Sequence, residues 1–213
     1  MGKLIEQLAP EYGFTSCSKH DLGWNPDEAK GCDVAVEFTT PDVALGNMEA
    51  LAERKVPVVV GTTGWLGYMD RVRTVVERNG TGLVWSPNFS IGVNIFFRLV
   101  REAARLAASE SQYGAWAWEI HHHTKKDAPS GTLLKLVEDM KAAGYARPID
   151  VSSNRAGAHP GTHEIGFDSA ADTITLRHTA RSREGFARGA LKAAQWIIGK
   201  KGVYEFSEIL FDG

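Results

Sequence analysis

Short apolar runs and amphipathic stretches alternate along the first part of the chain, and each run ends in a turn rich in Thr, Gly or Pro. Continuous valines such as those of 58–60 are typical of strands that are buried on both faces. The pattern predicts strands at 13–18, 33–38, 57–60 and 83–85. It also predicts a short helix that begins almost at residue 1 and ends before Pro10, and helices at 43–54 and 69–78. Because strands that alternate with single helices connect through right-handed crossovers, we expect a doubly wound, Rossmann-like parallel sheet of the α/β class.

The pattern changes after Gly92, where longer helices and strands with an alternating pattern take over. The second part is predicted to contain helices at 93–108 and 184–198, a helix capped by Ser130 that extends through Met140, and strands at 116–121, 162–167 and 173–180. We therefore expect two domains. The first comprises residues 1–90 and is completed by 184–213, and the second is an α+β domain of residues 91–183.

Three polar loops follow predicted strands of the first domain, at 38–40, 61–63 and 86–89. Ligands of doubly wound sheets bind beyond the carboxyl ends of the strands. The loops are therefore candidates for a ligand site, although Gly61–Thr63 could be a simple turn and Asn88 could cap a helix.

Composition narrows the possible partners. The chain of 213 residues has a formal net charge of −2, so no global field attracts nucleic acid or an anionic membrane. No apolar run approaches the roughly 18 residues of a membrane helix, and residues 1–6 do not resemble a signal peptide. Cys17 and Cys32 form no Cys-x-x-Cys pair and are too few for a disulfide framework. A cytoplasmic protein with reduced thiols is the expectation.

The densest chemistry lies in residues 119–132. A strand end delivers histidines and lysines to a loop, which then enters a helix at Ser130. Backbone N–H groups at a helix start bind carboxylates or phosphates, and Lys125 adds a mobile positive charge. A histidine titrates near neutral pH and can donate a proton. The segment therefore favours a site that binds a small anion and protonates it.

Less specific interpretations stand beside this one. The histidine run could belong to a purely structural loop or to a metal site, but His121 and His122 point to opposite faces of an extended strand. No metal is therefore expected. Arg155 could be a surface charge. The stripe of Trp116, Trp118 and Ile120 indicates core or subunit interface, and no catalytic role is expected for three other histidines, His20, His159 and His178.

The order Glu-x-His-His-x-x-Lys-x-Asp-Ala-Pro-Ser-Gly-Thr at 119–132 resembles the signature of the 4-hydroxy-tetrahydrodipicolinate reductase family, also called dihydrodipicolinate reductases. The resemblance extends over nearly the whole chain. It includes the segments 36–41, 60–65, 86–94, 155–157, 161–163 and 180–190. It implies reduction of a cyclic dicarboxylate by NADPH or NADH in lysine and diaminopimelate biosynthesis, by a cytoplasmic homotetramer whose two domains close on the reactants.

The resemblance also implies residue roles. His121 would donate the proton, and Lys125 would bind and polarise the substrate. The residues implied to hold the substrate carboxylates are His122, Lys125, Ser130, Gly131 and Thr132. The residues implied to contact the cofactor are Phe38, Thr39, Gly61, Thr62, Thr63, Ser86, Pro87, Asn88 and Phe89. Residues 1–90 would thus bind the nucleotide, and residues 91–183 would bind substrate and form the tetramer.

The resemblance breaks at the beginning of the chain. The family opens with a strand and a Gly-x-x-Gly-Arg/Lys-Met-Gly loop that approaches the pyrophosphate, whereas here only Met1 and Gly2 match, so Met1 is a marginal cofactor contact. We favour a start assigned at an internal methionine, over a shortened variant or a trimmed chain. The mass of the N-terminal peptide of the native protein would distinguish these.

A second departure concerns cofactor choice. Cys17–His20 stand where an acid that binds the ribose 2′-hydroxyl is usual, so Lys19 favours a 2′-phosphate and hence NADPH. Two other functions compete with the reductase. One is a related oxidoreductase such as a semialdehyde reductase, which lacks support because no reactive-cysteine signature is present. The other is a catalytically impaired, dicarboxylate-binding oligomeric protein without the nucleotide loop.

Overall fold

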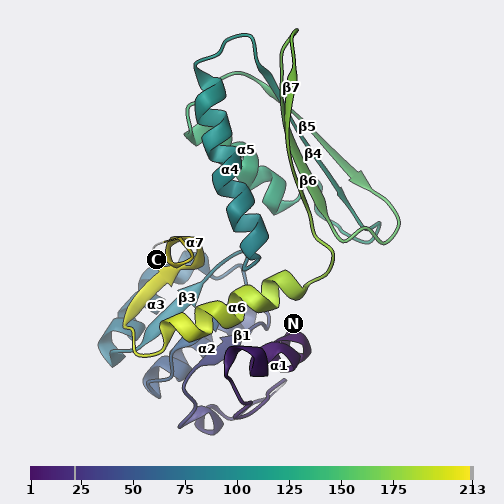
Figure 1. Ribbon diagram of the computed structural model, residues 1–213. Helices are drawn as coiled ribbons and strands as arrows, with labels where there is room; N and C mark the ends of the chain where they lie inside the picture. Colours follow the sequence, from purple (N-terminus) through teal and green to yellow (C-terminus); the bar gives the residue numbers. More distant parts are fainter. Residues whose placement is uncertain (22, 212–213) are drawn as a thin grey trace. The chain divides into compact units, whose positions relative to one another are not determined.

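The computed structural model describes residues 1–21 and 23–211. Contacts divide the chain into two compact units, Met1–Ile91 with Glu184–Gly213 and Gly92–Arg183 (Figure 1). The chain thus returns at Glu184 to the unit that contains the N-terminus. Among the described residues no helix is long and apolar enough to cross a membrane.

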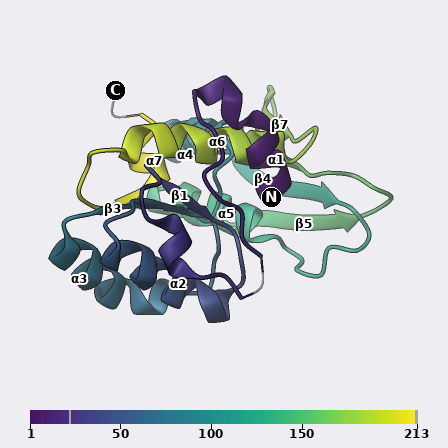
Figure 2. The same ribbon diagram turned by 90° about the horizontal axis from the view of Figure 1, so that it is seen from below.

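The first unit is built on a parallel sheet of four strands. They are β1 (Ala35–Glu37), β2 (Val58–Val60), β3 (Gly82–Trp85) and β8 (Gly202–Glu205), in the order β1-β2-β3-β8. Helices α2 (Pro41–Glu53) and α3 (Met69–Asn79) cover one face, and α1 (Gly2–Leu8) and α6 (Glu184–Ile197) cover the other (Figure 2). A short helix α7 (Phe206–Ile209) follows β8. The predicted α/β class is confirmed.

The alternation of valines explains why helices cover both faces of this sheet. Val58 and Val60 belong to one buried cluster, which includes Met48 of α2. Val59, between them, belongs to the opposite cluster, which includes Ala190 of α6. All three valines are 0–1% exposed.

The strand predicted at 13–18 is wrong. The 3₁₀ helix η1 (Ala9–Tyr12) ends at Gly13, whose φ of 77° turns the chain, and no regular element follows up to residue 20. A strand needs a neighbour for its backbone hydrogen bonds, and among the described strands β1 pairs only with β2. Phe14 instead packs partly buried against the core of the first unit.

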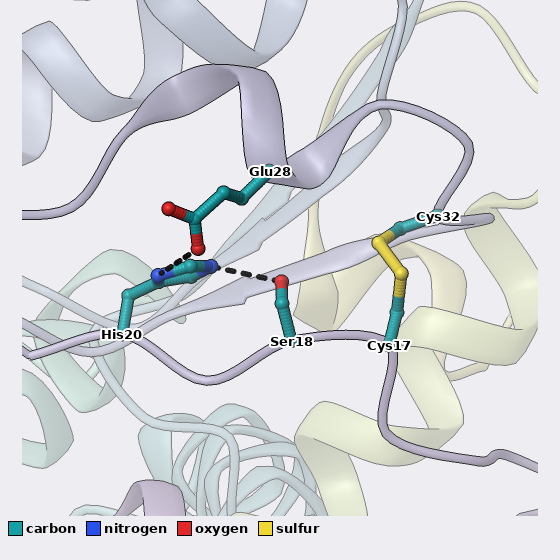
Figure 3. Close-up of a disulfide and its surroundings, with 5 residues drawn as sticks. All are labelled: Cys17, Ser18, His20, Glu28 and Cys32. Atoms are coloured by element: carbon teal, nitrogen blue, oxygen red, sulfur yellow. Dashed lines mark hydrogen bonds and ion pairs between the residues drawn. A yellow bond between two sulfur atoms is a disulfide. The ribbon is translucent and has the colours of Figure 1, made fainter.

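The expectation of two reduced thiols is also contradicted, because Cys17 and Cys32 form a disulfide (Figure 3). The 3₁₀ helix η2 (Pro26–Ala29) folds the intervening chain back, and the Asn25 side chain accepts a hydrogen bond from Asp27 N that caps it. His20 closes the same loop, with Nε2 2.8 Å from Ser18 Oγ and Nδ1 3.6 Å from Glu28 Oε2. Sequence spacing alone carries no sign of this folding back.

Opening the disulfide is expected to destabilise the chain. Cys17 and Cys32 are separated by 15 positions, and closing a loop of that length removes roughly 3 kcal/mol of unfolded-state entropy. Urea unfolding with and without dithiothreitol measures the difference. The double variant Cys17→Ser/Cys32→Ser is the control, since its midpoint should not respond to dithiothreitol. A wild-type midpoint that is equally unresponsive would contradict the prediction.

The second unit places two helices on one face of a mixed sheet. The strands β4 (Gly114–His121), β5 (Ile149–Arg155), β6 (Thr162–Asp168) and β7 (Thr173–Thr179) lie in the order β5-β4-β6-β7. β4 and β5 are parallel, and the other pairs are antiparallel. Helices α4 (Ile91–Ala108) and α5 (Gly131–Ala142) supply the core with residues such as Phe96, Leu133 and Met140. The pattern did not predict β5, which is a mostly exposed edge strand.

The alternating faces of β4 decide where chemistry can occur. Ala115, Ala117, Glu119 and His121 point to the buried side. The other face carries Trp116, Trp118 and Ile120, which are only half-buried. The tryptophan stripe therefore does not belong to the core of the second unit, and two titratable residues occupy the core side of a strand.

Candidate active site

The site in the second unit is assembled at the carboxyl end of β4 and the beginning of α5. Ser130 caps α5, because its extended backbone and its hydroxyl, 3.2 Å from Leu133 N, satisfy the first turn. The loop 122–129 connects the strand end to this cap. The predicted helix start at Ser130 thus brings the two ends of the sequence signature together.

Glu119 is the centre of this arrangement and is fully buried, at 0% exposure. Its carboxylate accepts hydrogen bonds from Ser130 N at 2.8 Å, from the Ser130 hydroxyl and from Arg155 Nη2 at 2.8 Å. His163 Nε2 lies 3.3 Å from Oε2. Burial alone raises the pKa of the Glu119 carboxyl, but the hydrogen bonds from His163, Ser130 and Arg155 outweigh it. The pKa is held well below its usual range, so Glu119 is an anion.

His121 lies beside this anion. Its Nδ1 is 3.5 Å from Glu119 Oε2 and has no hydrogen-bond partner in the part of the chain that the structure describes. Its ring passes the backbone of Gly161 so closely that a Cβ there would lie 3.0 Å from Nε2. The imidazole is 8% exposed, and burial lowers its pKa to about 4, against the opposing pull of Glu119. In the absence of a bound anion His121 is therefore neutral at pH 7.

Lys125 and Asp127 form the outer part of the site. Lys125 Nζ contacts Asp127 Oδ1 at 2.6 Å. The hydrogen bond from Lys125 is the main cause that lowers the pKa of Asp127, and the backbone of Gly131 contributes a further hydrogen bond. His122 Nδ1 is 2.7 Å from Thr124 Oγ1. A carboxylate thus already rests between a lysine and the start of α5.

Ser130 holds its donors inside the protein. Its N–H and its hydroxyl both serve Glu119, and the hydroxyl oxygen also accepts from Leu133 N. Ser130 therefore stabilises the end of the loop 122–129 and directs its donors to Glu119. Gly131 and Thr132, on the first turn of α5, are more exposed than Ser130.

Glu119, His121 and His163 are a group of potential metal ligands in the described part of the chain, with one atom from each within 4.8 Å of the others. The carboxylate of this group already faces the Arg155 guanidinium at 2.8 Å. A metal cation would have to share Glu119 with that positive charge. The donor set therefore favours a hydrogen-bonded ionic cluster.

The first unit brings the three predicted loops together at one edge of its sheet. Thr39 N donates to Thr62 Oγ1 at 2.8 Å, and Gly61 N donates to Glu37 O at 2.9 Å. Ser86 N reaches Val60 O at 3.3 Å. The loops after β1, β2 and β3 are thus neighbours, as parallel strands require.

The predicted cofactor residues differ in how much of them a ligand could reach. Thr39, Thr63 and Pro87 are exposed, and Gly61, Phe38 and Asn88 are half-buried. Gly61 is required by its neighbour, because a Cβ there would lie 2.1 Å from the Phe38 ring. Thr62 and Ser86 are buried, at 8% and 4% exposure.

The prediction that Phe89 contacts the cofactor needs correction as far as its side chain is concerned. It is 1% exposed and packs in the core 4.9 Å from the Phe206 ring, measured between centroids. Only the backbone around Phe89 could therefore meet a ligand. An apolar residue that follows a strand does not reveal from sequence whether it faces the ligand or the core.

Comparison with known proteins decides the family. Models of the N-terminal and C-terminal parts of dihydrodipicolinate reductase match residues 18–89 and 92–210. A 4-hydroxy-tetrahydrodipicolinate reductase of Christiangramia forsetii is 35% identical, over 100% of this chain and 94% of the relative. The chain belongs to the dihydrodipicolinate reductase family. Members of this family reduce their cyclic dicarboxylate substrate with NADH or NADPH in lysine and diaminopimelate biosynthesis.

One further relative and one solved structure are also similar to the chain. The reductase of Geotalea daltonii is 34% identical over 85% of this chain and 74% of its own length. A structure titled dipicolinate-bound dihydrodipicolinate reductase from Paenisporosarcina sp. TG-14 shares the fold with a TM-score of 0.70. It is 24% identical and covers 83% of this chain and 73% of that one. The resemblance seen in the sequence is confirmed.

The structure adds two residues whose roles the sequence did not reveal. Arg155 is not a surface charge, because its side chain is 16% exposed and bonded to Glu119. His163 is 6% exposed and its ring lies 5.0 Å from that of His121, between centroids. Both belong to segments that resemble the family. The register of β5 and β6 against β4 was needed to bring them to Glu119.

Two residues predicted as marginal cofactor contacts have other partners in the structure. Lys19, predicted to favour a 2′-phosphate, forms an ion pair with Glu6 of α1 and is 61% exposed. Met1 is the N-cap residue of α1 and packs partly buried against the core. A phosphate would have to compete with Glu6 for Lys19.

Proposed function

We propose that this chain reduces 4-hydroxy-tetrahydrodipicolinate, or its dehydrated form, with His121 as the proton donor and Lys125 as the substrate-binding cation. The observation that carries this proposal is the position of Asp127. Its carboxylate rests on Lys125 and receives a backbone hydrogen bond from Gly131. The same donors suit a carboxylate of the substrate, which would displace Asp127 into solvent, where it is already 55% exposed.

The chemistry assigned to His121 follows from its surroundings. When hydride adds to the conjugated ring, electron density moves toward the ring nitrogen, and the proton from His121 completes the reduction. His121 alone is mostly neutral at pH 7 because burial lowers its pKa to about 4. A dicarboxylate bound on Lys125 brings negative charge that favours the imidazolium. Substrate binding thus prepares the acid, and Lys125 stabilises the negative charge that develops on the ring.

The first unit is the proposed nucleotide-binding part, and residues 92–183 are the proposed substrate-binding part. The cofactor supplies the hydride when it is bound. Its site is at the carboxyl ends of β1, β2 and β3, where exposed Thr39 and Thr63 offer hydroxyl groups for a ribose. The half-buried Asn88 and the backbone beside it would orient the nicotinamide, and Gly61 keeps the loop close to Phe38. These residues fit a dinucleotide better than a metal or a phosphate ion alone.

A coupled assay tests the proposed function. The preceding synthase generates the substrate in situ, and oxidation of NADPH and of NADH by this chain is followed by the loss of absorbance. We expect turnover with at least one cofactor and inhibition by pyridine-2,6-dicarboxylate. Binding of pyridine-2,6-dicarboxylate without turnover or cofactor binding would favour the impaired, dicarboxylate-binding alternative. Absence of both activities in folded protein would refute the proposal.

We also propose a cytoplasmic homotetramer. The cytoplasmic location rests on the biosynthetic relatives and their nicotinamide cofactors. The proposed tetramer surface is the outer face of β4, where Trp116 and Trp118 border a depression that Asp150 and Glu164 also line. Large, half-buried aromatic side chains are typical of such interfaces.

Breaking this surface is expected to dissociate the tetramer. Trp118→Glu places a charge on the outer face of β4, and burying that charge in an interface is costly. Sedimentation velocity should then show smaller particles than for wild type. The control is Leu134→Glu on the exposed side of α5, which is 54% exposed. If wild type is a monomer, or if Trp118→Glu remains tetrameric, the assignment of this surface is wrong.

A further inference from the structure

We propose that Glu119 is a positioning residue that fixes one tautomer of His121, with Nδ1 protonated, and at the same time holds the start of α5 where the substrate carboxylate binds. This inference rests on the proposed function of His121 as the proton donor. It assigns a task to a buried carboxylate whose place in the sequence signature does not explain it.

The geometry of the carboxylate supports the tautomer. His121 Nδ1 lies 3.5 Å from Glu119 Oε2, and among the described residues it has no hydrogen-bond partner. A neutral imidazole carries one nitrogen-bound hydrogen, and an anion 3.5 Å from Nδ1 favours the tautomer with that hydrogen on Nδ1. When His121 is also protonated at Nε2, this second hydrogen is on the other nitrogen of the ring, at the edge that lies beside Gly161. Nε2 is therefore the atom that gives its proton to the substrate, and Nδ1 keeps its own.

The charges that face His121 support the same conclusion. Lys125, Arg155 and His163 all disfavour a positive charge on His121, and burial disfavours it most. Glu119 is the group that opposes them. Without its negative charge the imidazolium would stand among cations with no compensation. Glu119 thus keeps the acid form of His121 accessible when the substrate is bound.

The second task of Glu119 concerns α5. Its carboxylate holds both donors of Ser130, and Ser130 caps the helix whose first turn carries Gly131 and Thr132. One side chain therefore connects the acid on β4 to the carboxylate-binding turn. Arg155 keeps Glu119 ionised from the β5 side. A buried ionic cluster is rarely the most stable way to fill a core, and the two tasks proposed for Glu119 give this one a function.

Nitrogen NMR of the histidine rings tests the tautomer directly, with His121 assigned by the signal that His121→Gln removes. In wild type at pH 7 we expect a neutral His121 with its hydrogen on Nδ1. In Glu119→Gln we expect this preference to weaken or reverse. A wild-type His121 with its hydrogen on Nε2 would overturn the proposal, and this measurement requires no variant of Glu119 to fold.

Steady-state kinetics tests the effect of Glu119 on catalysis. For Glu119→Gln we expect kcat to fall by about tenfold to a hundredfold, part of what a general acid contributes. The descending limb of kcat/KM should move to lower pH, because the imidazolium loses its counter-charge. KM for NADPH should not change. Glu138→Gln, an exposed glutamate on α5, is the matched control and should behave as wild type.

The outcomes separate this inference from the proposed function. If wild type turns over substrate and Glu119→Gln keeps both its kcat and its pH profile, the positioning role is wrong while the reductase function stands. If wild type has no turnover, the proposed function fails. The tautomer of His121 in the NMR spectrum then still decides whether Glu119 orients it.

Discussion

Replacing His121 by glutamine is expected to lower kcat by roughly 10²- to 10⁴-fold, the usual contribution of a general acid. Glutamine fills a similar volume, so the buried site at the end of β4 should remain folded. Lys125 and the start of α5 do not depend on His121 for their hydrogen bonds. Binding of pyridine-2,6-dicarboxylate, measured by calorimetry, should therefore change little.

Turnover and dicarboxylate binding together distinguish a chemical role of His121 from a structural one. A loss of turnover with intact dicarboxylate binding indicates that His121 acts in the chemical step. Parallel loss of both would mean that His121 supports the structure of the site instead. A variant with wild-type kcat would remove His121 from the mechanism, and His122, which lies on the outer side of the loop, would become the next candidate.

The pH dependence of wild type follows from the same residue. Burial lowers the pKa of free His121 to about 4, so the protonated fraction decreases tenfold for each unit of pH above that value. We expect kcat/KM to decrease with rising pH in the neutral range. The profile of kcat should hold to higher pH, because the bound dicarboxylate stabilises the imidazolium. Identical profiles for kcat and kcat/KM would contradict this.

The sequence predicted the fold class well, and it predicted which segments converge on the candidate site, for identifiable reasons. Valine runs and helical periodicity are local signals, and they placed β2 and α3 within a few residues. The signature at 119–132 is local too, and it identified the strand end and the cap at Ser130. What failed depends on neighbours. Residues 13–18 have strand-like composition but no described pairing partner, and Cys17 meets Cys32 only because η2 folds back.

The same distinction applies within the site. Glu119, His121 and Ser130 lie in one segment, so their connection could be suspected from spacing. Arg155 and His163 reach Glu119 through strand register, in which His121 pairs with Arg155 and Glu119 pairs with His163. A shift of one residue would turn either side chain to the outer face. Pairing of distant strands is the information that a single sequence does not display.

Arg155→Met is expected to lower the free energy of unfolding by about 3–5 kcal/mol at pH 7, because it leaves a buried carboxylate without its cation. Glu119 is 0% exposed, so solvent cannot replace the guanidinium. Methionine retains much of the arginine's apolar stem, which limits the loss of packing. Urea unfolding measures the effect. The control is Arg105→Met, whose pair with Glu102 is exposed on α4 and should contribute at most about 1 kcal/mol.

The dependence on pH distinguishes a lost charge pair from lost packing. The pKa of Glu119 is lowered in the folded chain, so its ionised form contributes stability above the pKa of the unfolded chain, and this stability is lost as pH falls. Without Arg155 the carboxyl protonates more readily, so the difference between wild type and Arg155→Met should shrink toward pH 4. Adding Glu119→Gln to Arg155→Met should recover part of the stability at pH 7. A deficit that is constant with pH and unchanged in the double variant would mean that Arg155 matters for packing alone.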